Sequence, residues 1–98
     1  MITEKEIMQV LSKAMHPEID YSLAELGMIK KVNVERNNVE VTINLPFQGI
    51  PIKDDLARIV IDTITDANQS LQVKIEFATM NEKERKEFMS KAQEKWKL

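Results

Sequence analysis

The chain has 98 residues, a formal net charge of −2 and no cysteine. At this length we expect one domain, residues 1–98, with a core that needs no disulfides. The near-neutral charge provides no basic field for nucleic acid or an anionic membrane. Because no apolar run could span a bilayer and no signal-peptide pattern opens the chain, we expect a cytoplasmic protein. The missing thiols exclude disulfides, thiolate metal ligands and thiol catalysis.

The N-terminal segment is predicted to form a helix over about residues 3–15, where apolar residues recur at the helical period. Pro17 would end this helix because the residue before a proline avoids helical dihedral angles. A short helical turn is expected next. Ser22 and Glu25 have the spacing of a capping box, and Gly27 suits the left-handed cap that follows.

The middle of the chain is predicted to form a hairpin, a helix and a third strand. Apolar and polar residues alternate over 31–35 and 39–45, with a turn at 36–38 between them. Apolar residues recur at the helical period over about 51–67, and apolar and polar residues alternate again over 71–77. Each strand therefore has one apolar face.

The last predicted element is a charged helix over residues 81–96 with a thin apolar stripe. The order is helix-strand-strand-helix-strand-helix. Since the strands have one apolar face each, we expect an α+β two-layer sandwich, with helices mainly on one face of a three-stranded mixed sheet. The stripe at Phe88, Ala92 and Trp96 would pack on its own domain or on a second copy rather than bind a ligand.

The residues give little support to catalysis or metal binding. No serine, threonine or lysine lies in a diagnostic nucleophile setting, so we expect no enzymatic activity. His16 is the single histidine, and with Glu18 and Asp20 it could hold a divalent ion. The alternative is that His16 and Glu18 form a polar helix end. Phe47 and Ile50 either fold back onto the core or form an exposed apolar tip for a partner.

Three stretches carry a resemblance to a known family. They are His-Pro-Glu-Ile-Asp at 16–20 with Leu-Ala-Glu-Leu-Gly-Met-Ile at 23–29, Gly-Ile-Pro at 49–51, and the amphipathic strand at 71–77. In this order the chain resembles the small iron–sulfur maturation domain family of SufT, PaaD and the N-terminal domain of Mrp/ApbC-type carriers. The resemblance covers about residues 2–78. It implies a cytosolic accessory or targeting role in iron–sulfur cluster assembly or metalloprotein maturation.

The chain departs from the family pattern Asp-Pro-Glu, Leu-Gly-Leu/Met-Val, Thr-x-x-x-Gly-Cys-Pro at three positions. This chain has His16 in place of the aspartate, Pro46 in place of the threonine and Ile50 in place of the cysteine. Thiolates are the usual ligands of iron–sulfur clusters, so this cysteine-free variant is expected to hold no cluster and no cofactor. Residues 1–80 would form the family core, and the helix in 81–98 lies outside it.

We therefore expect an adaptor that acts by protein–protein interaction, with an iron–sulfur carrier or a client apoprotein as its partner. The alternatives are a divalent metal binder that uses His16, or a structural subunit that forms a homodimer through its sheet edge or last helix. Neither nucleic acid nor a membrane is expected as a partner. The predicted partner-binding residues are Glu18, Asp20, Glu25, Gly27, Phe47, Gly49, Ile50 and Pro51.

Overall fold

The computed structural model describes residues 2–96, which form three helices and three strands in the predicted order. Residues 97 and 98, the end of the predicted C-terminal segment, lie outside the described residues. The elements are α1 (Glu4–Leu11), β1 (Ile29–Glu35), β2 (Asn38–Leu45), α2 (Lys53–Ala67), β3 (Gln72–Thr79) and α3 (Glu82–Lys95).

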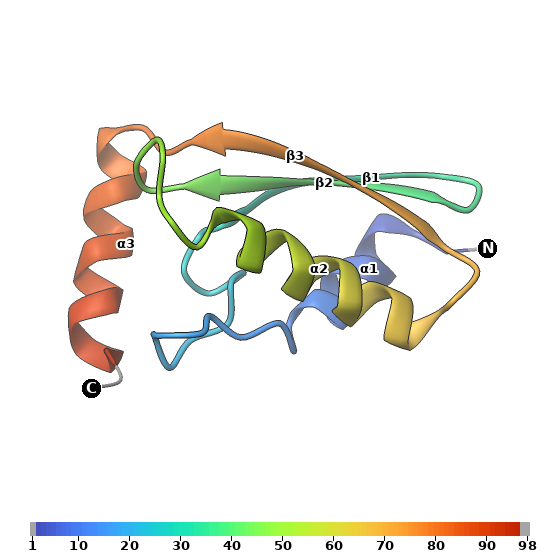
Figure 1. Cartoon of the computed structure of the whole chain (residues 1–98), viewed down its shortest axis with the longest axis horizontal. Coiled ribbons are helices and arrows are strands. Elements are labelled where there is room, and N and C mark those ends of the chain that lie inside the picture. Colours follow the sequence, from blue (N-terminus) through green and yellow to red (C-terminus); the bar gives the residue numbers. More distant parts are fainter. Residues whose placement is uncertain (1, 97–98) are drawn as a thin grey trace.

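The three strands form one mixed sheet with the order β1-β2-β3. β1 and β2 make an antiparallel hairpin, whereas β2 and β3 run parallel and are joined through α2. The predicted α+β class and mixed sheet are therefore confirmed. β1 and β3 are the two edges of the sheet. α3 begins directly after β3 and lies across the end of the sheet (Figure 1).

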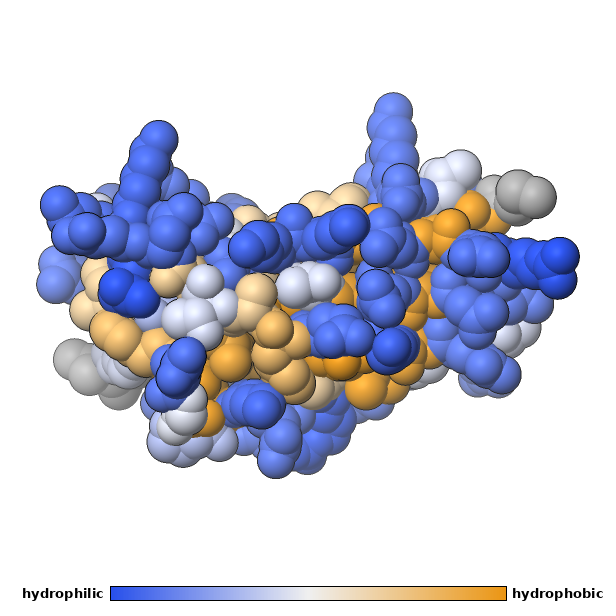
Figure 2. All heavy atoms as spheres, turned by 90° about the horizontal axis from the view of Figure 1, so that it is seen from above, coloured by the Kyte–Doolittle hydropathy of each residue, from blue (hydrophilic) through white to orange (hydrophobic). Residues whose placement is uncertain are grey.

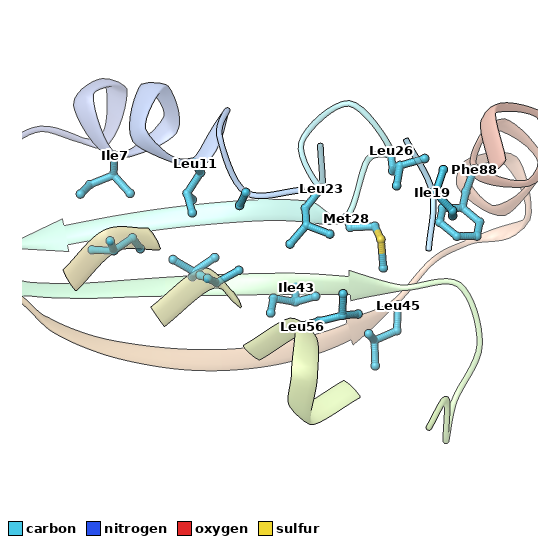
Figure 3. Packing of buried hydrophobic residues seen from close by; sticks show 14 of the residues in the cluster. Ile7, Leu11, Ile19, Leu23, Leu26, Met28, Ile43, Leu45, Leu56 and Phe88 are labelled. Atoms are coloured by element: carbon cyan, nitrogen blue, oxygen red, sulfur yellow. The ribbon is translucent and has the colours of Figure 1, made fainter. Parts of the chain in front are cut away.

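The hydrophobic core lies between one face of the sheet and the helices α1 and α2 (Figure 3). Alternation along β2 points every second side chain to this face, and Val39, Val41 and Ile43 are fully buried. The helical period gives α2 its buried stripe. That stripe consists of Leu56, Val60 and Ile64.

The first helix ends four residues earlier than the sequence predicts. α1 stops at Leu11, after which Ala14 and Leu23 share a backbone hydrogen bond of 2.8 Å. Met15 then forms an isolated antiparallel bridge with Ser22. These long-range backbone bonds replace the helical ones, so the expected helix over 3–15 is wrong at its C-terminal end. None of the helices within residues 2–96 is long and apolar enough to cross a membrane.

Candidate functional site

The two loops that carry the family motif meet at the end of the sheet, next to α3. We call residues 16–20 the histidine loop and residues 46–51 the proline loop. Between them and α3 lies an open groove of about 730 Å³. Most of its lining side chains are apolar. The lining residues are His16, Glu18, Ile19, Met28, Pro46, Phe47, Ile50, Pro51, Ile52, Phe88, Met89, Ala92, Gln93 and Trp96.

Arg85 of α3 holds the proline loop in place. Its Nε donates a hydrogen bond of 2.7 Å to the backbone carbonyl of Pro46, and its Nη2 donates one of 3.0 Å to that of Met80. The guanidinium also lies over the Phe47 ring, with Cζ at 5.1 Å from the ring centroid. Gly49 turns the loop with a φ of 72°, in the left-handed region that favours glycine.

The two apolar residues of the proline loop have different surroundings. Ile50 is half-buried and packs against the core, as one of the two interpretations of the sequence predicts. Phe47 is 49% exposed, which fits the other interpretation of an apolar tip. Ile50 therefore attaches the proline loop to the core, whereas Phe47 lies at the surface.

The end of α3 holds the histidine loop. The backbone N–H of Asp20 donates a hydrogen bond of 2.8 Å to the carbonyl of Lys95, and Ile19 forms an antiparallel bridge with Trp96. His16 is only 3% exposed, and its Nδ1 accepts a hydrogen bond from the Glu18 backbone N–H at 3.0 Å. The loop is thus a folded part of the groove wall.

The histidine loop gives no support to the metal-binding hypothesis. Nδ1 of His16 is occupied by the Glu18 backbone N–H. Within the part of the chain that the structure describes, no group of three or more His, Cys, Asp or Glu residues could hold an ion. The complete sequence also has no cysteine for an iron–sulfur cluster. The residues present therefore do not fit a bound cluster.

The structure brings half of the predicted partner-binding residues together in the groove. Glu18, Phe47, Ile50 and Pro51 line it. The other four, Asp20, Glu25, Gly27 and Gly49, are not among the lining residues.

Glu25 and Gly27 belong to the turn that follows the histidine loop. The Glu25 carboxylate accepts a hydrogen bond of 2.8 Å from the Ser22 backbone N–H, and Ser22 Oγ accepts one from Glu25 N–H, which confirms this capping box. These bonds with Ser22 lower the pKa of Glu25 below its ordinary value. Gly27 then takes a φ of 76°. Lys91 of α3 donates to the backbone carbonyl of Glu25 at 2.6 Å.

The wall that α3 supplies was not predicted as part of the site. Phe88 and Ala92 are buried beneath the helix, which confirms that this part of the stripe packs on its own domain. Met89 and Trp96 also line the groove but are 41% and 47% exposed. Trp96 is the C-cap residue of α3 and follows Met89 by seven positions, a two-turn spacing that could have indicated this second surface.

Comparisons with known proteins agree with this fold. The family model described as "Iron-sulfur cluster assembly protein" matches residues 4–77, well over half of the chain. The chain belongs to this family, as the sequence motifs predict. α3 lies beyond the matched residues.

Two individual proteins are similar to the chain. The iron-sulfur cluster carrier protein of Mycobacterium leprae (strain TN) is 29% identical over 82 residues. This match covers 83% of the chain but only 21% of the carrier, so the chain spans about a fifth of its relative's length. The crystal structure of a DUF59 domain from Bacillus anthracis shares the fold, with a TM-score of 0.66 and 19% identity over 79% of this chain and 73% of that one.

Proposed function

We propose that this chain is a non-catalytic accessory protein of iron–sulfur cluster assembly that acts in the cytoplasm. It binds a protein partner, either an iron–sulfur carrier or a client apoprotein, through the groove. One observation carries the proposal. The two loops form an open apolar groove that is lined by Ile50, the residue that stands where the family pattern resembled by this chain has a cysteine.

The exposed side chains of the groove suit a protein surface. Phe47, Met89 and Trp96 are large and apolar, and each is more than two-fifths exposed. Aromatic residues and methionine are enriched at protein–protein interfaces. A thioether side chain such as that of Met89 also adapts to partners of different shape. The buried residues beneath them, Phe88 and Ile19, give these contacts a rigid base.

The cluster is cargo in this proposal, and its thiolate ligands come from the partner. Since no residue of this chain can supply a thiolate, the chain contributes binding and orientation rather than coordination. The Glu18 carboxylate at the groove margin would orient the partner by its charge.

The proposal is tested by anaerobic capture of the tagged protein from its native cells, with identification of what co-purifies. We expect iron–sulfur carriers or apoproteins with the wild type. Phe47→Asp should abolish their capture because it places a charge in an apolar interface. The matched control is Met8→Asp, which changes an exposed methionine of α1 outside the groove and should leave capture unchanged.

Two outcomes of the capture experiment would each reject part of the proposal. Equal capture by Phe47→Asp and wild type would show that the groove is not the interface. If iron–sulfur proteins are absent from the wild-type capture, the role in cluster assembly is wrong. Ile50→Asp serves as a second groove variant, once circular dichroism shows that it folds, because Ile50 packs on the core.

A further inference from the structure

We propose that the free edge of β3 pairs with β3 of a second copy of this chain. The pairing is antiparallel and centred on Ile75, so that two three-stranded sheets become one continuous sheet. The inference does not rest on the proposed function, since it uses neither the groove nor the family loops. It rests on the free backbone edge of β3, its regular register and the order of its charges.

The backbone of β3 offers unpaired donors and acceptors along its outer edge. Gln72 N–H donates to Asn37 at 2.8 Å and Met80 N–H donates to Leu45 at 2.7 Å, both toward the β2 side. Backbone groups alternate in direction along a strand. Those of Val73, Ile75 and Phe77 therefore point away from β2. Among the described residues, β2 is the only strand that pairs with β3.

The two edges of the sheet differ in how they are protected. β1 has a register irregularity between Ile29 and Lys31, and it carries Lys30 and Lys31 side by side. Bulges prevent a sheet edge from pairing, and lysines do so unless the incoming strand places an opposite charge against them. β3 keeps a regular register with β2 over all eight of its residues and contains no proline. Its edge is therefore the one that is open to another strand.

The side chains of β3 would gain burial from a neighbour. Val73, Ile75 and Phe77 pack on the core but are only half-buried, whereas their register partners in β2 are fully buried. β3 is the uppermost strand over the left half of Figure 1. From above, hydrophobic side chains reach the surface between hydrophilic ones (Figure 2). A strand added at this edge would remove part of the exposed apolar area of Val73, Ile75 and Phe77 from water.

The charges of β3 are complementary to themselves in this register. Pairing Ile75 with its own copy places Lys74 opposite the partner's Glu76, and symmetry repeats that pair. Both pairs fall at positions without mutual backbone hydrogen bonds, where facing side chains are closest. Centring the pairing on Lys74 or on Glu76 would instead oppose like charges.

The ion pairs that Lys74 makes within one copy would extend to the second copy across the interface. Lys74 Nζ lies 3.7 Å from the Glu40 carboxylate of β2 and 3.2 Å from that of Glu76. In the dimer, Lys74 lies between Glu40 on one side and the partner's Glu76 on the other. Because β3 and its copy run in opposite directions, the two α3 helices and the two grooves lie at opposite ends of the joined sheet. The grooves stay open.

The test is sedimentation velocity over a series of concentrations, using Lys74→Glu and Glu76→Lys. We expect a wild-type monomer–dimer equilibrium, and a dissociation constant about tenfold or more weaker for each variant alone, because like charges then face each other twice. An equal mixture of the two variants should recover the association, since each introduced charge then faces an opposite one. This recovery should weaken as salt is added.

The controls are Lys83→Glu and Glu87→Lys, which make the same charge changes at exposed positions of α3. They should associate as the wild type does. Circular dichroism establishes that every variant is folded. A wild type that stays monomeric up to millimolar concentration would overturn the proposal. So would single variants that associate like the wild type, or a mixture that recovers nothing.

Discussion

Arg85 connects α3 to the proline loop through two backbone carbonyls and an aromatic ring. Arg85→Ala would leave the buried Pro46 carbonyl without this donor. Hydrogen bonds to charged groups contribute about 1.5–3 kcal/mol, so we expect a loss of stability of this order. Urea denaturation followed by circular dichroism measures it.

Two further variants decide whether the fork geometry of Arg85 matters. Arg85→Lys keeps the charge but cannot make both planar contacts and the stacking, so it should recover only part of the loss. Lys86→Ala, at the next and exposed position, should change stability by less than about 0.5 kcal/mol. If Arg85→Lys is as stable as the wild type, charge alone holds the loop.

Glu84 makes the start of α3 sensitive to acid. Its carboxylate accepts a hydrogen bond of 2.9 Å from Asn81 N–H, and this bond, with a further one from the Asn44 side chain, lowers the pKa of Glu84 below its ordinary value of 4.5. The Glu84 carboxylate therefore binds a proton more readily in the unfolded chain than in the folded one. The stabilisation is present above that ordinary value and is lost as pH falls through the lower folded pKa.

We expect Glu84→Gln to reduce the dependence of unfolding free energy on pH in this acidic window. Urea denaturation at a series of pH values provides the comparison. Glu87→Gln removes a carboxylate from the same helix away from its cap, and it should keep the wild-type slope. An unchanged slope in Glu84→Gln would contradict the role given to this cap.

At the scale of elements, α3 has a buried side and an exposed side, and residues of both line the groove. Phe88 is 6% exposed, and replacing a buried phenylalanine with alanine costs about 3–5 kcal/mol. Met89 follows it directly but is 41% exposed. We expect Phe88→Ala to destabilise the fold strongly. Met89→Ala should change stability by less than about 1 kcal/mol and still reduce partner capture.

Denaturation and anaerobic capture, measured on the same two variants, separate these roles. Equal destabilisation by both substitutions would show that Met89 belongs to the core rather than to the groove wall. Capture that is unaffected by Met89→Ala would limit the interface to the two loops.

The elements that could be predicted from the sequence are those that local periodicity defines. Alternation identified β2, and the helical period identified α2 up to its stop at Asn68. The end of α1 could not be predicted, because the competing backbone bonds, such as that between Leu23 and Ala14, follow neither the helical period nor strand alternation.

The candidate site was predictable to the extent that short motifs define it. The histidine and proline loops carry the family pattern, so the sequence located both. The third wall depends on how α3 docks, through contacts such as Arg85 to Pro46 that span 39 residues. Local patterns contain no such information, although the two-turn spacing of Met89 and Trp96 could have indicated that both lie on the groove side.

At the scale of the whole molecule, the groove and the free edge of β3 are separate surfaces. The residues that line the groove belong mainly to α3 and the two loops beside it. β3 forms an edge along the side of the sheet, and α3 lies across its end (Figure 1). The residues of the groove and of the edge do not overlap. A partner in the groove and a second copy on β3 are therefore compatible with each other. We therefore expect the variants proposed for one surface to leave the other unchanged.

The methionines of the groove have a consequence for redox chemistry. A chain without cysteine has no thiol to oxidise, but Met28 and Met89 both line the groove, and Met89 is exposed. Oxidation to the sulfoxide makes this side chain polar, and reductases can reverse the change. Oxidation of Met89 would thus make the wall of the groove more polar without the involvement of a thiol.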